Sequence, residues 1–212
     1  MVTGNPVRPE LLGGNRARGV QRFGLDPAVP LVYVTGGAQG SHRINRTVGA
    51  ALAPLLSACQ VVHQCGDNEF DDAGWLGGEA AALPEAARAR YRVTPFVTDA
   101  LADLYAAATL VVGRAGAGTV TELAALGLPS VLIPLPGARG DEQTANARIL
   151  AEAGAAVLLP EAELSTERLV AVVRELLAAP ERLAQMAEGA RSVATPDAAE
   201  RLVDLILALA RP

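Results

Sequence analysis

Lysine is absent from this sequence of 212 residues, so all 18 of its basic residues are arginine. A Walker-type phosphate loop and a Schiff-base enzyme both need a lysine amine, and both classes are therefore excluded. The net charge is −5, and no basic run is longer than two residues. Because a nucleic-acid-binding protein would carry a basic patch or stripe, we expect no nucleic-acid partner.

Cysteine and histidine are almost as scarce. Cys59 and Cys65 form no CxxC pair and predict no disulfide framework, which suits a reducing compartment. His42 and His63 lack neighbours at metal-ligand spacing, and Asp71-Asp72 is interpreted as a solvated loop, so we expect no bound metal. No secretory leader opens the chain, and no apolar run approaches the ~18 residues of a membrane span. These absences predict a soluble cytoplasmic domain.

From residue 31 onward, short apolar runs alternate with helix-like blocks, a pattern typical of a parallel sheet covered on both faces. The expected strands span residues 31–35, 60–64, 91–95, 109–113, 130–134 and 155–159. The expected helices span residues 41–57, 99–107, 118–126, 141–153, 165–178, 180–193 and 196–210. Thr195 is the expected N-cap of the last helix, and residues 72–90 predict a loop with a short helix. The predicted fold class is α/β, a Rossmann-like doubly wound parallel sheet.

Residues 1–30 differ from the rest, because they hold four Pro and five Gly and show no clear period. We interpret them as an extended lead-in or interdomain linker outside the sheet, followed by one domain over residues 31–212. In a doubly wound sheet, ligands bind beyond the carboxyl ends of the strands. The loops that follow the strands are therefore where a site is expected.

The first expected strand leads into Gly36-Gly37-Ala38-Gln39-Gly40-Ser41 and then into a helix. Glycines let the backbone approach an anion, and a helix N-terminus offers unpaired N–H groups to phosphate. An ordinary glycine-rich turn explains this loop equally well. The spacing is not GxGxxG, so the fingerprint of a nicotinamide or flavin dinucleotide site is not met.

The fourth expected strand leads into a second glycine-rich joint, residues 114–122 (RAGAGTVTE). One interpretation places a pyrophosphate on the amides of Ala117, Gly118 and Thr119. Glu122 would then bind a ribose, because the two oxygens of a carboxylate can each accept one O–H. The alternative is a capping box, in which Thr119 and Glu122 begin a helix. The spacing alone favours the capping box. The preceding Gly-Ala-Gly favours the pyrophosphate site, so the two interpretations are about equally supported.

The loop after the fifth expected strand carries Asp141-Glu142-Gln143-Thr144-Ala145-Asn146. Gln143 and Asn146 are three residues apart at a helix start and share one face. Amides in this position can bind sugar hydroxyls with both donors and acceptors. The alternative is that Asp141 is an N-cap and both amides are solvated.

Taken in order, these segments resemble the MurG family, part of glycosyltransferase family 28, which transfers N-acetylglucosamine from UDP-GlcNAc to lipid I to make lipid II of peptidoglycan. The resemblance covers nearly the whole chain. The matching stretches are residues 3–8 (TGNPVR), 35–40 (TGGAQG) with Asn45, 63–66 (HQCG), 93–97 (VTPFV), 114–124 (RAGAGTVTELA), 127–129 (GLP) and 141–147 (DEQTANA).

The resemblance implies a GT-B fold, in which two Rossmann-like domains face a cleft. Residues 31–212 would be the C-terminal domain, which binds the UDP-sugar donor. By position, Arg8 would meet the donor diphosphate and the backbone of Val97 the uracil. The remaining implied contacts are Ala38, Gln39, Gly40, Ala117, Gly118 and Thr119 on phosphate, Glu122 on ribose, and Gln143 and Asn146 on the sugar. The family usually has Ser in place of Ala38, which puts activity in doubt more than fold.

The resemblance also implies an N-terminal acceptor domain, with the catalytic His, that these 212 residues do not include. The resemblance therefore assigns no catalytic residue to this chain, which we expect to bind UDP-GlcNAc without metal and to be inactive alone. Its partners would be the missing acceptor domain or subunit and, through it, a lipid-linked acceptor, with the full-length enzyme peripheral at the inner face of the cell membrane. The open alternatives are the donor subunit of a two-chain UDP-GlcNAc transferase, an isomerase domain resembling UDP-GlcNAc 2-epimerase, and a non-catalytic nucleotide-sugar-binding module.

Overall fold

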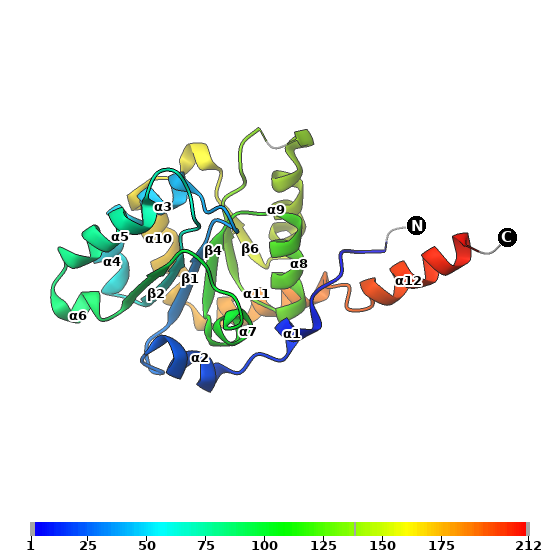
Figure 1. The fold of residues 1–212 in the computed structure, drawn as a ribbon, viewed down its shortest axis with the longest axis horizontal. Helices are drawn as coiled ribbons and strands as arrows, with labels where there is room; N and C mark the ends of the chain where they lie inside the picture. The colour runs from blue at the N-terminus through cyan, green and yellow to red at the C-terminus, as the bar shows by residue number, and fades with distance from the viewer. Residues whose placement is uncertain (1–2, 138, 211–212) are drawn as a thin grey trace.

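The structure, a computed structural model, describes residues 3–137 and 139–210. Within these residues the chain forms one six-stranded sheet in the order β3-β2-β1-β4-β5-β6, and all neighbouring strands are parallel (Figure 1). The strands are β1 Leu31–Thr35, β2 Gln60–Gln64, β3 Tyr91–Thr94, β4 Leu110–Gly113, β5 Ser130–Leu132 and β6 Ala156–Leu158. This order reverses direction between β1 and β4, as in classic doubly wound folds. The predicted fold class is confirmed.

Both faces of the sheet are covered, which explains why its central strands are apolar without alternation. All five residues of β1 are buried. Val32 and Val34 belong to one core cluster, and Leu31 and Tyr33 belong to the cluster on the opposite face. A single strand therefore contributes to two cores.

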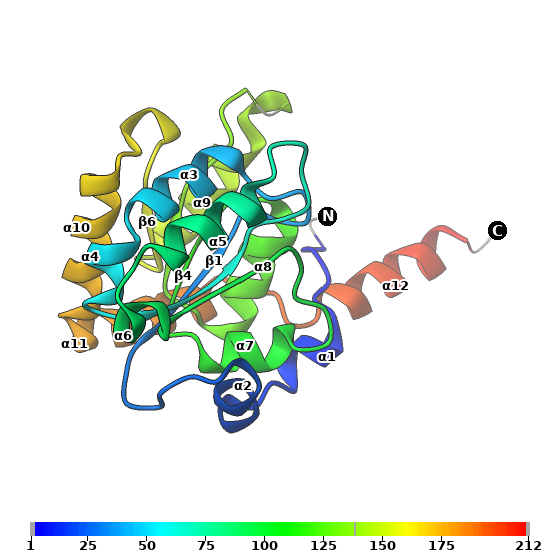
Figure 2. The ribbon, with the colours of Figure 1, turned by 60° about the vertical axis from the view of Figure 1, so that its left-hand side comes forward.

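The helices form two layers around the sheet (Figures 1 and 2). The first core is completed by helices α3 His42–Ala50, α4 Leu52–Leu56, α5 Asp72–Ala81, α6 Glu85–Arg88, α10 Thr166–Leu177 and α11 Pro180–Ser192. The second core is completed by α1 Pro9–Leu12, α2 Arg16–Phe23, α7 Leu101–Ala107, α8 Ala117–Leu126 and α9 Glu142–Glu152. Two short 3-10 turns, η1 Arg139–Asp141 and η2 Glu161–Glu163, precede α9 and α10.

Residues 3–30 lie outside the sheet, as expected, but the expectation that they are extended is wrong over α1 and α2. The side chain of Asn15 caps α2 by accepting from the N–H of Arg18 at 3.0 Å. Asp103 of α7 in turn accepts from the N–H of Asn15 at 2.7 Å and from Arg18 Nη2 at 2.8 Å. These bonds, first of all that from Arg18, lower the pKa of the Asp103 carboxyl. Proline and glycine content alone does not predict this tertiary docking.

Two further predictions need correction. The segment 72–90 is mostly helical, since α5 has ten residues and begins at Asp72. The preceding Asp71 caps it by accepting from Gly74 N–H at 3.3 Å. The last helix, α12 Ala198–Leu209, has Asp197 rather than Thr195 at its N-cap position. The hydroxyl of Thr195 instead packs against Gly4, where a Cβ would come within 2.5 Å of it.

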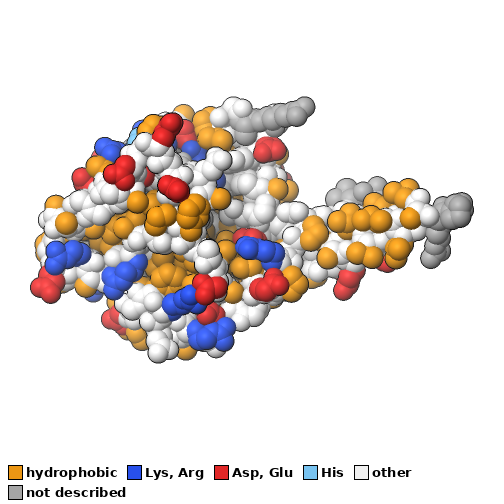
Figure 3. All heavy atoms as spheres, viewed as in Figure 1, with side chains coloured by type: hydrophobic (Ala, Val, Ile, Leu, Met, Phe, Trp, Pro, Cys, Tyr) orange, Lys and Arg blue, Asp and Glu red, His pale blue; other side chains and the backbone are white. Residues whose placement is uncertain are grey.

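Helix α12 projects away from the two layers (Figures 1 and 2). Apolar side chains line much of its visible surface in Figure 3. The large exposed apolar residues of α12 are Leu202, Val203, Ile206, Leu207 and Leu209. None of the helices within residues 3–137 and 139–210 combines the length and apolar character needed to cross a bilayer.

Candidate functional site

A cleft opens where the strand order reverses. Thr35 of β1 lies beside Gly113 of β4, and the loops after these two strands diverge to opposite sides of the sheet. Two cavities, of about 650 and 220 Å³, lie above this point. Both are lined by Gly37, Ala38 and Thr119, so they form one continuous cleft. We call them the larger and the smaller cavity.

The loop after β1 forms one wall of the cleft and is locked by close backbone packing. Gly40 has a φ of +72°, and a Cβ there would come within 1.8 Å of the carbonyl oxygen of Cys65. Ser41 caps α3 by accepting from the N–H of Ile44 at 3.4 Å. Ala38 and Gln39 are exposed and line the larger cavity. All three residues predicted to bind phosphate here therefore line the larger cavity, and Gly40 also shapes the loop.

The loop after β4 leads into α8, whose first turn forms the opposite wall. The N-cap residue is Gly116, and no side chain caps the helix. A Cβ at Gly116 or Gly118 would meet nothing within 4 Å. Because α8 begins at Ala117, Thr119 is already its third residue, and the capping-box alternative is wrong. The free N–H groups of this first turn suit an anion.

Glu122 lines the smaller cavity, and its carboxylate accepts hydrogen bonds from two side chains. Tyr105 of α7 donates its O–H to Oε2 at 3.0 Å, and Arg8 donates from Nη2 to Oε1 at 3.4 Å. Burial, together with the neighbouring Tyr33 and Glu122, raises the pKa of the Tyr105 phenol well above its ordinary value. Arg8 therefore lies beside the predicted ribose carboxylate, and it does not line the larger cavity. Sequence reasoning missed Tyr105, since nothing in its local pattern marks it.

Gln64, which was not predicted as a site residue, joins the smaller cavity to the loop after β1. Its Oε1 accepts from the N–H of Val97 at 3.0 Å and from the O–H of Tyr33 at 3.2 Å. Its Nε2 donates to the carbonyl of Gly37 at 3.2 Å. Val97, whose backbone is predicted to meet the uracil, lines the smaller cavity, and its N–H is engaged by this amide. Tyr33 also stacks edge-on against Tyr105 at 5.6 Å between ring centres.

Gln143 and Asn146 tie α9 to the loops before it. Gln143 Oε1 accepts from the N–H of Leu135 at 3.0 Å and of Ala115 at 3.3 Å, and Asn146 Nδ2 donates to the carbonyl of Ala115 at 3.1 Å. The alternative of two solvated amides is therefore wrong. Asp141 occupies the N-cap position of α9, but its side chain does not cap the helix. Gln143 lines the larger cavity, whereas Asn146 lines a separate hollow beside α8.

Arg114 is a buried cation at the back of the larger cavity. Its Nη1 donates to the carbonyls of Ile133 and Pro134 at 3.1 and 3.0 Å, and its Nη2 donates to Ser41 Oγ at 2.8 Å. It also forms an ion pair with Glu161 of η2. Arg114 lies in the predicted RAGAGTVTE joint, but its sequence pattern indicates no role for it. The structure shows that it joins the loops after β1, β4 and β5.

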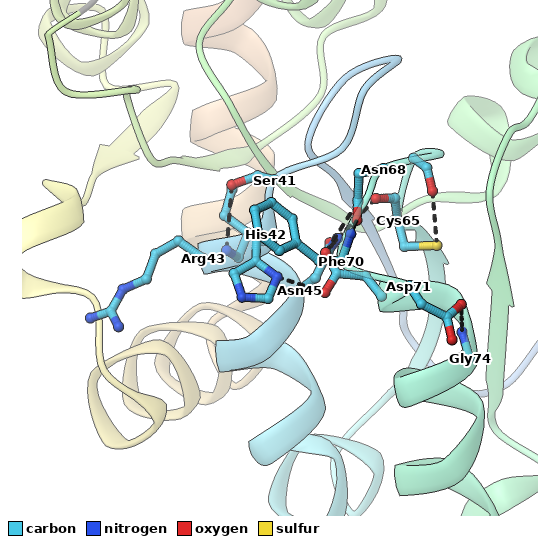
Figure 4. A network of polar contacts seen from close by, with 12 residues as sticks. Ser41, His42, Arg43, Asn45, Cys65, Asn68, Phe70, Asp71 and Gly74 are labelled. Carbon is cyan, nitrogen blue, oxygen red and sulfur yellow. Dashed lines mark hydrogen bonds and ion pairs between the residues drawn. The ribbon is translucent and has the colours of Figure 1, made fainter.

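A polar network backs the loop after β1 (Figure 4). Asp72 is buried, not solvated as predicted, and accepts from His42 Nδ1 at 2.8 Å and from Asn45 Nδ2 at 2.7 Å. Asn45 Oδ1 also accepts from His63 Nε2 at 3.0 Å, and His63 Nδ1 accepts from the O–H of Tyr91 at 2.9 Å. Burial lowers the pKa of the fully buried His63 to about 3. Among the residues that the structure describes, no cluster of His, Cys, Asp or Glu is arranged to hold a metal ion.

Comparison with known proteins identifies the family. Residues 31–202 match the glycosyltransferase family 28 C-terminal domain. The chain is 42% identical over 211 residues to the UDP-N-acetylglucosamine--N-acetylmuramyl-(pentapeptide) pyrophosphoryl-undecaprenol N-acetylglucosamine transferase of Nocardioides sp., covering 97% of this chain and 55% of that protein. The protein of the same name from Xanthomonas campestris is 44% identical over 207 residues, covering 97% of this chain and 46% of that protein.

Among solved structures, Acinetobacter baumannii MurG matches with a TM-score of 0.75 and 31% identity, covering 95% of this chain and 55% of that one. The chain thus spans about half the length of the curated relatives it matches. Its sheet and helix layers correspond to the C-terminal half of a GT-B glycosyltransferase. The protein belongs to glycosyltransferase family 28 and carries the C-terminal domain of that family.

Proposed function

We propose that this chain binds UDP-GlcNAc as the donor half of an N-acetylglucosaminyltransferase that acts on a lipid-linked acceptor, converting lipid I to lipid II. The names of the relatives from Nocardioides sp. and Xanthomonas campestris support this donor and this acceptor class. The single observation that carries the proposal is the continuous cleft at the β1/β4 reversal. It has a carboxylate at one end, an uncapped helix N-terminus in the middle and amide side chains at the other end.

The dimensions of the cleft suggest an orientation for the donor. The uracil would occupy the smaller cavity beside Val97, with the ribose hydroxyls on Glu122. The diphosphate would lie where the cavities join, against Ala38 and the first turn of α8 at Ala117, Gly118 and Thr119. The sugar would fill the larger cavity toward Gln143, while Asn146 supports that wall through Ala115. Arg8 would exchange its contact with Glu122 for the diphosphate.

The proposal extends to the rest of the enzyme. Residues 1–30 would connect this domain to an N-terminal acceptor domain or subunit that supplies the catalytic base and the lipid-linked acceptor. The full-length enzyme would work from the cytoplasm, peripheral at the inner face of the cell membrane. This chain would supply binding and electrostatic stabilisation of the departing UDP, without metal.

Calorimetric titration of the chain with UDP and with UDP-GlcNAc, in the presence of a chelator, tests donor binding. We expect binding of both, because two strand-to-helix loops present backbone N–H groups to the diphosphate. GDP serves as the control and is expected to bind more weakly, because the smaller cavity is matched to a pyrimidine. Binding that appears only with magnesium contradicts the metal-free mechanism, and equal binding of GDP contradicts the uracil assignment.

Transfer of labelled GlcNAc to lipid I or a soluble analogue tests the division of labour. We expect no turnover by the chain alone and recovery when an N-terminal half is supplied, because acceptor activation needs a base on that side. Robust turnover by the chain alone would refute this proposal. Epimerisation of UDP-GlcNAc without an acceptor would instead favour the isomerase alternative.

A further inference from the structure

His42 is an imidazole at the edge of the larger cavity that is held in one orientation. It is the first residue of α3 and lines that cavity together with the loop after β1. Its side chain is 42% exposed, whereas the carboxylate of Asp72, which bonds its Nδ1 at 2.8 Å, is fully buried. The ring of Phe70 stacks on it with 4.2 Å between ring centres (Figure 4).

This arrangement fixes which nitrogen the imidazole offers to a ligand. Asp72 is itself fixed, since it also accepts from Asn45 Nδ2 at 2.7 Å and from Asn68 Nδ2 at 3.1 Å. With Nδ1–H committed to the carboxylate, Nε2 is the atom available to a ligand. An imidazole that carries a proton on each nitrogen can donate at both ends, to Asp72 through Nδ1 and to a ligand oxygen through Nε2.

The other basic side chains of the larger cavity already have partners. Those described are Arg43 and Arg114. Arg43 points away from the rings of His42 and Phe70 (Figure 4) and donates to the carbonyl of Leu164 at 2.9 Å. Arg114 is almost fully buried and paired with Glu161. Arg43 is exposed as well, but its side chain is bonded toward Leu164. Among these basic side chains, His42 is therefore the one that is exposed and oriented by a fully buried carboxylate.

We propose that His42, oriented by Asp72, donates from Nε2 to the β-phosphate of the nucleotide and neutralises charge there. The inference rests on the proposed function, and it adds which phosphate His42 contacts. The order of residues along the cleft supports that assignment. In the proposed orientation the α-phosphate would lie at the junction marked by Gly37 and Thr119, which line both cavities, whereas His42 lines only the larger one. A nucleotide whose uracil occupies the smaller cavity therefore presents its second phosphate, and not its first, to His42.

Calorimetric titration of the chain with UDP and with UMP tests this assignment. His42→Gln keeps a polar side chain of similar reach but removes the imidazole. It should weaken UDP binding about tenfold, the scale of a hydrogen bond to a charged group, and leave UMP binding unchanged. Arg46→Gln is the matched control, because it removes a positive charge from the same helix, where Arg46 stacks on Trp75 outside the cleft. It should change neither affinity.

Melting temperatures of the variants, measured in parallel, confirm that each one folds. Equal losses of UDP and UMP affinity in His42→Gln, or no loss at all, overturn the assignment while the proposed function stands. A loss of UDP affinity in Arg46→Gln as large as that in His42→Gln also overturns it. The loss would then come from the change in net charge of the domain and not from a contact with His42. If the unaltered chain binds neither nucleotide, the proposed function fails, and the role of His42 fails with it.

Discussion

The two glycine-rich joints that flank the cleft use glycine for opposite reasons. After β1, a side chain at Gly40 would collide with the backbone of Cys65, so glycine is needed for packing. After β4, side chains at Gly116 and Gly118 would meet only open space. Ser41 caps the helix after the first joint, whereas no side chain caps the helix after the second. The first joint is therefore closely packed at Gly40, whereas the first turn after the second joint is left open.

A glycine motif alone does not distinguish a joint that is closely packed from one that is open. Both joints follow a strand, precede a helix and carry several glycines. They differ in what surrounds the missing Cβ, and that depends on segments distant in the sequence.

Gly40→Ala should give the largest effect, because it adds a side chain at a positive φ and within contact of the Cys65 carbonyl. Backbone strain and overpacking together should lower the free energy of unfolding by about 3 kcal/mol or more. Urea denaturation followed by circular dichroism measures the change. A variant as stable as the original would show that the first joint is not locked as described.

Lowering the pH should have the second-largest effect, because it destabilises the residues that support the loop after β1. Because the folded pKa of His63 is about 3 and the unfolded pKa about 6.5, the unfolded state binds the extra proton between these values, and stability falls as the pH falls through this window. The expected loss from pH 7 to pH 5 is about 2 kcal/mol from this residue. His63 bonds Asn45, whose Nδ2 donates to the Cys65 carbonyl at 2.8 Å. Urea denaturation at both pH values should show a smaller loss in His63→Gln, and an identical loss would assign the acid sensitivity elsewhere.

Glu122→Gln tests the open joint. Loss of the charged acceptor should weaken UDP binding by about 1–2 kcal/mol, the scale of a charge-assisted hydrogen bond. The melting temperature should change little, because an amide can still accept the Tyr105 hydroxyl. Glu142→Gln, an exposed acid at the start of α9, controls for net charge. If UDP binds both variants with the original affinity, Glu122 does not hold the ribose.

Gly118→Ala should give the smallest change in stability and separates the two uses of glycine most clearly. It adds a methyl group to open space in the first turn of α8, where alanine favours the helix by up to about 1 kcal/mol. We expect equal or higher thermal stability together with weaker UDP binding, measured by calorimetry on the same preparation. An undiminished affinity would mean that the phosphate does not approach this turn.

The strands could be predicted from the sequence because each is a short apolar run between breakers, and β1 and β2 match the expected bounds residue for residue. The strand expected over 109–113 begins one residue too early, and those expected to end at residues 95, 134 and 159 end too late because apolar residues continue into the loops. Pro134, for example, continues the apolar run after β5, but its carbonyl accepts from Arg114 rather than joining the sheet. Helix α5 was underestimated because its alanines and glycines give a weak local signal.

The candidate site was predicted only in part, since local patterns place loops but not partners. The sequence located both joints and Glu122. It did not locate Tyr105, which lies 17 residues before Glu122 on another helix and meets it only through the fold. Asp72 likewise looked solvated because its partners, His42 and Asn45, come from a separate helix.

The pairing of β1 with β4 also governs when the cleft can exist. Val32 lies beside Leu110, so about 78 residues must be looped out before these two strands meet. The neighbouring β1–β2 and β2–β3 contacts close much shorter loops, which cost less entropy and form sooner. The emerging chain can therefore assemble one half of its sheet early. The cleft, with one wall from each half, is created in the later step that brings β4 against β1.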